Sequence, residues 1–381
     1  MIRSLFLLVG ILSSLMADDW VLDNNKTEKD SLFFNDKGVL DVSDYLSKAY
    51  GFLPVPVLIT EPAVGYGAGA AFVYLHDKFV GKKSSDGRQI PASMSGIVAT
   101  GTENGTKFGG SFHIGYYLED RLRTITFVGY PSININFYKN DKGFLTNVQG
   151  PVFYQTLKGR VGDSNLFLGG GYVYSKIETS LKPTVIDRDF ERKFTTAAIE
   201  LVAEYDARDN TLSPNRGYYV NAKAHIFNKA VGNDSNFERY SAYGMVYIPI
   251  SKTFTLESKM MGESIVGEDV PFYVYPFLMQ RGIRIMRYQG EHTASAELQL
   301  RWEFIERWSA LFFGGAGKAF GKDQLNLEQV SFSEAPTRYS KGVGFRYLIA
   351  KKFGLRMGVD VASSEHDKAL YIQFGSAWVG F

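Results

Sequence analysis

The segment ELQLRWEF, residues 297–304, alternates between polar or charged residues and large apolar residues along its whole length. The polar positions are Glu297, Gln299, Arg301 and Glu303. Successive side chains of a β-strand point to opposite faces, so the segment predicts a strand with one ionic face and one apolar face. Residues 342–349 and 353–362 show the same period of two, with Arg346 and Asp360 opposite the apolar side chains. This period indicates an all-β fold.

Strands with these faces fit either a soluble sandwich or a barrel in a membrane, and two features favour the barrel. The apolar faces are continuous and end in Trp, Tyr or Phe, as expected at the two interfaces of a bilayer. A charge on the lipid-facing side at the midplane costs roughly 2 to 4 kcal/mol, which accounts for the segregation. The connections also alternate between short turns and long loops, and the long ones lie near residues 76–92, 178–192, 265–292 and 320–338. We therefore predict a transmembrane antiparallel β-barrel.

We expect about sixteen strands, each near the roughly 9 to 11 residues that cross a bilayer at a tilt. They are expected to begin near Val64, Ser93, Lys107, Arg121, Ser132, Val148, Asn165, Lys193, Gly217, Phe237, Thr253, Thr293, Ser309, Ser340, Phe353 and Ala369. An even number returns the C-terminus to the periplasmic side, so the loop 265–292 is expected to be extracellular. The chain ends in Phe381, an aromatic terminus typical of strands recognised by the barrel insertion machinery.

The N-terminal residues indicate export. A basic residue, an apolar run from Leu5 to Met16 and then Ala17 have the order of a secretory signal, and the run is too short for a membrane helix. We expect a signal peptide at 1–17, a periplasmic segment and proline-containing linker at 18–63, and the barrel domain at 64–381. The chain has no cysteine, which excludes disulfides and thiol catalysis. Its net charge of +2 gives no reason to expect nucleic acid as a partner.

Two glycine-rich motifs suggest nucleotide binding but lack the required context. GYGAGA at 65–70 matches the dinucleotide pattern, yet its glycines alternate along a predicted strand and no helix follows. GGAGKAF at 314–320 has Ala319 where a phosphate-binding loop needs Ser or Thr. The five histidines show no metal-ligand spacing, and no Gly-x-Ser-x-Gly element exists. We expect no enzymatic activity, no cofactor and no metal.

Residues 205–227, YDARDNTLSPNRGYYVNAKAHIF, resemble the turn and strand of the bacterial surface antigen superfamily of outer-membrane barrels. Its turn motif corresponds to Tyr205, Asp206, Arg208, Asp209, Pro214 and Gly217. The segments ERYSAYGMVYIPI, DVPFYVYPFLMQRGIR, YQGEHTASAELQLRWEF and LFFGGAGKAF follow in the family's order. The resemblance covers the last half of the chain. The superfamily includes assembly barrels of the BamA/TamA type and two-partner secretion transporters.

The resemblance implies a role for the basic segment MQRGIRIMRYQG. In the family, an Arg-Gly motif on the long loop folds back into the barrel; here this implies Arg281 and Gly282, with Arg284 after them. An arginine in a confined lumen needs carboxylate partners, because an unpaired buried charge is costly, and Gly282 allows close approach or a positive φ. The candidate partners on the ionic strand faces are Asp360, Glu303 and Glu297, with Arg301 beside them. The alternative is a solvated basic surface loop.

The sequence also departs from the family pattern. Gln280 and Ile283 replace the usual aliphatic and aromatic neighbours of Arg-Gly. Gly315 stands where many members have aspartate, and Gln299 where a carboxylate is common, so Asp360 or Glu303 is expected to substitute as the arginine's partner. The stretch before the predicted barrel is short for the family's periplasmic repeats. The resemblance therefore implies a reduced member without POTRA repeats.

From the resemblance we expect an integral protein of the bacterial outer membrane with a role in outer-membrane protein assembly, translocation or envelope biogenesis. The implied partners are outer-membrane lipid and lipopolysaccharide, the barrel insertion machinery, and a client membrane or secreted protein. Glycine weakens strands, so we hypothesise a weak seam between the first and last strands. The glycines concerned are Gly65, Gly67, Gly69, Gly375 and Gly380. A closed structural surface antigen or a passive small-solute pore is the alternative.

Overall fold

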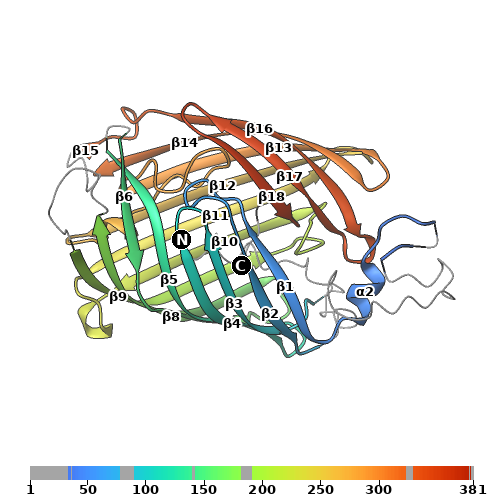
Figure 1. The fold of residues 1–381 in the computed structure, drawn as a ribbon, viewed down its shortest axis with the longest axis horizontal. Helices are drawn as coiled ribbons and strands as arrows, with labels where there is room; N and C mark the ends of the chain where they lie inside the picture. The colour runs from blue at the N-terminus through green and yellow to red at the C-terminus, as the bar shows by residue number, and fades with distance from the viewer. Residues whose placement is uncertain are drawn as a thin grey trace.

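The computed structural model describes residues 33–35, 37–77, 90–139, 142–181, 191–322, 329–376 and 378. Its strands form an antiparallel sheet that curves into a barrel, with the short helix α2 (Ser43–Lys48) at one end (Figure 1). None of the helices in these ranges has the length and apolar character needed to cross a membrane. The signal peptide expected at 1–17 and the terminal Phe381 lie outside the described residues.

The sheet has 18 strands, and each wall strand pairs with its neighbour along the chain. Their bounds are β1 (Gly51–Ile59), β2 (Gly67–Leu75), β3 (Met94–Thr102), β4 (Lys107–Tyr117), β5 (Leu122–Lys139), β6 (Lys142–Gln149), β7 (Val152–Arg160), β8 (Leu166–Leu181), β9 (Glu191–Asp206), β10 (Gly217–Phe227), β11 (Phe237–Pro249), β12 (Phe254–Gly267), β13 (His292–Ile305), β14 (Trp308–Lys322), β15 (Gln329–Val330), β16 (Arg338–Ala350), β17 (Leu355–Ser364) and β18 (Lys368–Phe374). The connections contain the 3-10 turns η2 (Lys229–Val231), η3 (Phe272–Val274) and η4 (Lys351–Phe353).

The barrel wall contains about the predicted number of strands, because β6 and β7 together act as one wall strand and β15 only extends the tip of β14. The first part of β5 pairs with β7 and its second part pairs with β6. The prediction of a separate strand that begins near Ser132 is therefore wrong. The interruption lies in the neighbouring strand, where Gly150 adopts a φ of +143° and donates its N–H to the carbonyl of Pro131.

The first wall strand is β1, which pairs along all nine of its residues with β2. The segment 18–63 therefore contributes a strand to the sheet, and the glycine-rich strand is second instead of first. Pro54 and Pro56 fit β1 because it lies at an edge, where a missing N–H group breaks no ladder bond. The other edge strand is β18. In the part of the chain that the structure describes, no ladder joins β18 to β1; the Ile372 N–H donates to Thr60 Oγ1 over 3.3 Å.

The outward side of the wall is apolar and the inward side is charged, as the alternation predicts, except that the inward side of the first strands is mainly apolar. The outward sides carry exposed apolar residues such as Phe72 and Leu298. The inward sides of β9 to β17 carry buried charged residues, including Glu200 and Asp360. The inward sides of β1 to β6 are mainly apolar instead of ionic. These side chains form one hydrophobic cluster with residues of the β12–β13 connection, namely Phe277, Ile285 and Met286.

The two ends of the barrel carry different elements, and we name them the α2 end and the loop end. Helix α2 lies against the turn after β16, where the Val42 N–H donates to the carbonyl of Ile349 over 2.8 Å. The loop end is the opposite end, where β6 and β15 lie (Figure 1). Because Leu75 pairs with Gly51, the connection 76–92 begins at the α2 end. The expectation that the long connections lie on one side of the barrel is therefore wrong for this one. The reason is that the strand expected near Ser132 is part of β5, so every later strand runs in the opposite direction, relative to β2, from the one expected.

Candidate functional site: the loop inside the barrel

The connection 268–291 between β12 and β13 folds into the barrel. Its two arms are joined by the Leu278 N–H, which donates to the carbonyl of Tyr288 over 3.0 Å. The tip turns where the Ile283 N–H donates to the carbonyl of Gln280 over 3.1 Å. The buried apolar residues of the connection are Val270, Val274, Tyr275, Phe277, Leu278, Ile283, Ile285 and Met286. Burial of this apolar surface stabilises the loop in the lumen and positions Arg281 at the tip.

Arg281 is buried, with 8% of its surface exposed. Its Nη1 donates to Asp360 Oδ2 over 3.0 Å, and its backbone N–H donates to Glu297 Oε1 over 3.0 Å. The guanidinium also lies over the ring of Phe313, with 3.6 Å between Cζ and the ring centroid. Two of the candidate carboxylates thus contact this residue: Asp360 through the side chain, and Glu297 through the backbone and, at 3.7 Å from Nε, through the side chain. A solvated surface loop does not fit this burial.

Asp360 binds a second arginine besides that of the loop. Arg346 Nη1 and Nη2 donate to its two carboxylate oxygens over 2.6 and 2.9 Å, which makes a bidentate pair. Asp360 has no exposed surface. Gly344 is its cross-strand neighbour, and a Cβ atom there would lie 2.0 Å from Asp360 Oδ1. The space for the carboxylate therefore depends on a glycine in β16.

Gly282 brings the loop backbone against the last two strands. It has a φ of +86°, which disfavours any residue with a side chain. A Cβ atom at this position would lie 3.1 Å from the backbone nitrogen of Ser363 and 3.2 Å from Cβ of Ala362. Its N–H donates to the hydroxyl of Tyr371 on β18 over 3.1 Å. Both reasons for a glycine, positive φ and close approach, apply here.

Glu303 and Arg301 belong to a different network, nearer the α2 end. Arg356 Nη2 donates to Glu303 Oε1 over 2.7 Å, and Arg301 Nη1 lies 3.2 Å from Glu257 Oε1. Glu303 is six residues beyond Glu297 along β13, which corresponds to roughly 20 Å of strand. This separation explains why Glu303 contacts Arg356 and not the loop arginine.

Arg284 lies at the loop end, beside the edges of the sheet. Its backbone N–H donates to Asp367 Oδ2 over 3.2 Å, and its Nε is 3.3 Å from Asp367 Oδ1. Asp367 belongs to the turn before β18, whereas Glu61 belongs to the turn after β1. Burial and the negative charge of Asp367 raise the pKa of Glu61 to about 7, against the opposing effects of the Ala63 N–H and Arg284. The loop therefore lies close to one acidic residue beside β1, Glu61, and to one beside β18, Asp367.

The turn motif of the family closes part of the lumen at the α2 end. Arg208 Nε donates to Asp206 Oδ1 over 2.8 Å, and its guanidinium lies 4.4 Å from the ring centroid of Tyr219. The carbonyl of Pro214 accepts a hydrogen bond from Arg301 Nη1 over 3.3 Å. The turn is thereby tied to the charged network inside the barrel.

The remaining residues of the motif shape the turn itself. Asp209 Oδ1 accepts the backbone N–H groups of Asn215 and Arg216 over 2.9 and 3.2 Å. Tyr205 stacks on Tyr218 with 5.4 Å between ring centroids. Gly217 has a φ of +106°, and a Cβ atom there would lie 2.1 Å from the carbonyl oxygen of Ala207. These contacts are structural and place no reactive group in the lumen.

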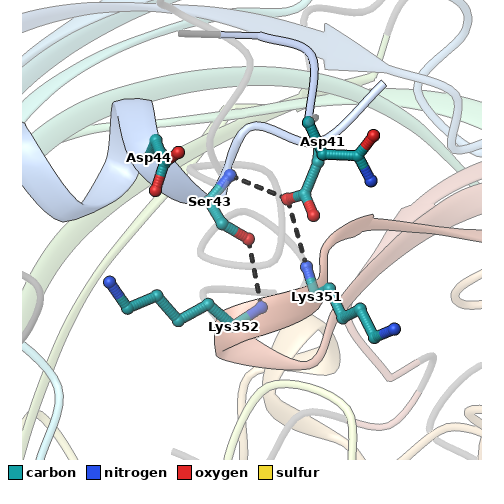
Figure 2. Close-up of a pocket in the computed structure, with 6 residues that line it drawn as sticks. Asp41, Ser43, Asp44, Lys351 and Lys352 are labelled. Carbon is teal, nitrogen blue, oxygen red and sulfur yellow. Dashed lines mark hydrogen bonds between the residues drawn. The ribbon is translucent and has the colours of Figure 1, made fainter. Parts of the chain in front are cut away.

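Helix α2 is anchored to the barrel by backbone groups of η4 (Figure 2). Asp41 Oδ1 accepts the N–H groups of Ser43 and Lys351 over 3.0 and 3.4 Å, and Ser43 Oγ accepts the N–H of Lys352 over 3.0 Å. Burial raises the pKa of Asp41, but hydrogen bonds from Ser43 and Arg307 outweigh this effect and lower it below its ordinary value. A carboxylate thus fixes the segment before β1 to the turn after β16.

The C-terminal segment also enters the lumen, which the sequence analysis missed. β18 ends at Phe374, and Gly375 turns the chain inward with a φ of +75°. Trp378 is 3% exposed, and its Nε1 donates to Glu297 Oε2 over 2.8 Å. Glu297 therefore joins the loop tip to the C-terminal segment. The available signal was the break in alternation at FGSAWVGF, where Gly375 and Ser376 follow the last regular position.

A second buried charge network was also missed. Arg123 Nη1 and Lys158 Nζ donate to the two oxygens of Glu204 over 2.7 and 2.6 Å, and Arg123 Nε donates to Asp120 Oδ1 over 2.6 Å. The signal in the sequence was the spacing of Glu200, Glu204 and Asp206, which places three acids on the inward side of one strand. This network lies toward the α2 end, away from the loop tip.

Comparisons with known proteins agree with this architecture. Residues 91–275 match the Omp85 superfamily domain. The fold is similar to that of BamA from Haemophilus ducreyi lacking POTRA domains 1–3, with 15% identity, a TM-score of 0.58, and coverage of 85% of this chain and 68% of that chain. It is also similar to CdiB from Escherichia coli, with 8% identity, a TM-score of 0.54, and coverage of 84% of this chain and 61% of that chain. No curated protein matches the sequence.

At these identities the two structures establish the fold, and the domain match connects that fold to a family. The outward apolar surface and the inward charges place the barrel in a bilayer. The chain is an outer-membrane β-barrel protein, and its residues 91–275 match the Omp85 superfamily domain.

Proposed function

We propose that the protein inserts or translocates client polypeptides through a seam between β1 and β18. The observation that carries this proposal is the missing ladder between these strands in the described residues, whereas the other neighbouring wall strands are joined by ladders. Unpaired edges present backbone N–H and C=O groups to any extended chain that approaches. A client strand can therefore pair with an edge that is already open.

Two prolines in β1 favour an open edge. Pro54 and Pro56 are two residues apart, so their nitrogen atoms point to the same side of the strand. The register with β2 spans the whole of β1, and ladder bonds on that side need N–H groups. This supports an orientation in which both prolines face β18 and withhold two donors from it. The seam then contains few backbone hydrogen bonds, so separating the two strands requires little free energy.

The loop supports the same proposal because it contacts the seam from inside. Gly282 donates to Tyr371 on β18, and Arg284 pairs with Asp367 before β18. On the other side, Ile285 and Met286 belong to the hydrophobic cluster that includes Val55 of β1. The loop thus contacts both edge strands, although no ladder joins them in the described residues. Movement of the loop by a client therefore releases both edges at once.

A disulfide across the seam tests the proposal. Thr60 and Ile372 are in contact across the seam through a hydrogen bond, so these two positions are chosen for the cysteines. The chain has no cysteine of its own, which leaves the engineered pair as the only thiols. The matched control is Leu58→Cys with Ala68→Cys, an outward pair across the intact β1–β2 ladder.

Both variants are introduced into a deletion strain, and the outer-membrane protein profile is measured by mass spectrometry with and without a reductant. We expect oxidised Thr60→Cys/Ile372→Cys to reproduce the deletion profile and to recover on reduction, whereas the control restores the normal profile in both conditions. Heat-dependent gel mobility verifies that each barrel is folded. A seam variant that stays fully functional when cross-linked would favour a closed structural barrel or a passive pore.

A further inference from the structure

The outward side of the last strands is divided into rows that run across the sheet. In the row nearest the loop end, Lys341 of β16 pairs with Ser363 of β17, and Ser363 pairs with Lys368 of β18. We call these three residues the cationic row. Both lysines are exposed. The strands concerned lie side by side in Figure 1.

The next three rows toward the α2 end carry no charge. The first contains Phe312, Val343, Val361 and Leu370. The second contains Ala310, Phe345, Val359 and Ile372. The third contains Trp308, Tyr347, Met357 and Phe374, and its aromatic residues are of the kind that lies at a membrane interface. The change from lysine to exposed aliphatic residues occurs between adjacent rows, within roughly 7 Å of strand.

The cationic row has the dimensions of a site for one anionic group. Neighbouring strands are about 4.8 Å apart, so the backbones of Lys341 and Lys368 are separated by about 10 Å. Two lysine side chains can converge across this distance on a group that lies over the Ser363 hydroxyl. Gly314 pairs with Lys341 on the other side and adds no side chain there. The arrangement offers two cations and a hydroxyl on one exposed surface.

The nearby carboxylates are already engaged by other groups. Glu365 Oε2 accepts from Arg338 Nη1 over 3.1 Å, and Asp367 is buried against Arg284. No ion pair between either lysine of the cationic row and a carboxylate is found in the described ranges of the chain. Lipid-facing charges are stable only at the depth of the headgroups. The lysines therefore need an anion supplied by the membrane.

We propose that Lys341, Ser363 and Lys368 bind the phosphate group of a membrane lipid in the leaflet at the loop end. The ammonium groups contact the phosphate oxygens, the Ser363 hydroxyl donates a hydrogen bond, and the acyl chains lie over Val343, Val361 and Leu370. The corresponding row at the α2 end is aromatic, so it offers no such site. Among the described residues of these last strands, the phosphate site therefore lies only in the leaflet at the loop end, beside the β18 edge.

Native mass spectrometry of the detergent-purified barrel tests this site with diphosphorylated lipid A as the probe. We expect Lys341→Gln/Lys368→Gln to weaken lipid binding about tenfold or more, because each basic residue contributes to headgroup attraction. Lys341→Arg/Lys368→Arg is expected to retain binding, which shows that the loss is one of charge. The matched control is Lys37→Gln/Lys252→Gln, which removes two exposed lysines at the α2 end and leaves binding unchanged.

Two further probes identify the recognised group. The fully dephosphorylated lipid should bind the wild-type protein as weakly as the phosphorylated lipid binds the glutamine variant. Inorganic phosphate should fail to displace the phosphorylated lipid, because it lacks the chains that lie on the apolar rows. Equal binding of phosphorylated lipid by wild type and the glutamine variant, or displacement by inorganic phosphate alone, would overturn the proposal.

Discussion

A side-chain carbon at position 315 would lie 2.8 Å from Nε2 of Gln280, so Gln280 and Gly315 share one space inside the barrel. The amide also donates to Ser340 Oγ over 2.7 Å. Both residues depart from the pattern that the family resemblance implies, and the structure places them next to each other. Gln280 occupies volume that a larger residue at 315 would need, while Arg281 pairs with Asp360 instead of an acid at position 315.

The shared space predicts non-additive mutations. Gly315→Asp alone should lower the free energy of unfolding by about 1 to 3 kcal/mol, because overpacking forces neighbouring side chains from their preferred positions. Gln280→Ala removes the amide but not Glu297 Cγ or the carbonyl oxygen of Ala296, which would lie 2.8 and 2.9 Å from the same carbon, so the double variant should recover part of this loss. Urea unfolding in detergent, followed by gel mobility without boiling, measures the four proteins of the cycle. Simple addition of the two single effects would contradict the coupling.

Arg281→Ala should loosen the loop tip and increase ion conductance through the barrel. The substitution removes the hydrogen bond to Asp360 and the stacking on Phe313. Single-channel recordings in planar bilayers measure the effect, and larger or more frequent openings are expected. Arg121→Ala is the control, because it removes an arginine that pairs with the exposed Asp163 away from the loop. Unchanged conductance in Arg281→Ala would show that the loop tip does not occlude the lumen.

Asp360→Asn should be the most destabilising single change in the loop site. It removes the charged partner of Arg346 and leaves Arg281 only Glu297, whose Oε2 is 3.7 Å from the arginine Nε; breaking a buried ion pair costs about 3 to 5 kcal/mol. The urea midpoint is expected to fall accordingly. Asp163→Asn removes the exposed partner of Arg121 and should change stability by less than about 1 kcal/mol. If both variants unfold at the same urea concentration, Asp360 is not the central carboxylate of the site.

The pH dependence of stability should contain a contribution from Glu61. Its pKa is raised from 4.5 to about 7, so the folded state binds the proton more tightly than the unfolded state. The contribution is therefore fully present below about pH 4.5 and is lost as the pH rises to about 7. The facing groups that influence it are Arg284, Asp367 and Tyr371.

Glu61→Gln should flatten the stability profile between these pH values, since glutamine does not titrate. Thermal unfolding of wild type and variant across the range measures the difference. Glu334→Gln serves as the control, because Glu334 is exposed in a loop and contacts Ser331 instead of the seam. An identical slope in wild type and Glu61→Gln would place the titrating group elsewhere.

Much of the architecture could be predicted because a bilayer imposes a simple rule on each strand. Apolar residues such as Leu298 and Val361 face lipid, and charged residues such as Glu297 and Asp360 face inward. This rule acts locally, so it is readable from alternation in a single segment. It predicted the barrel, the approximate number of wall strands and the inward faces from β9 onward.

The prediction failed where local pattern does not decide the pairing. The segment with Pro54 and Pro56 fitted either an entry strand or a linker and was placed before the barrel, yet it is the first strand of the sheet, because an edge tolerates proline. The long β5 was expected to be two strands, beginning near Arg121 and Ser132, although the irregularity lies in its partner at Gly150. Both errors concern neighbours in the sheet, which a single segment does not specify.

The sequence by itself determined which side chains face the lumen and that the loop carries an arginine that needs an acid. Only the tertiary structure decided that this acid is Asp360 and that Glu303 binds Arg356 instead. It also decided that Trp378 donates a hydrogen bond to Glu297. The physical reason is that strand alternation shows only that a carboxylate points inward, and it does so equally for every inward carboxylate. Their distances to the loop depend on the stagger between strands and on the path of the C-terminal segment, which are set by packing of the whole barrel.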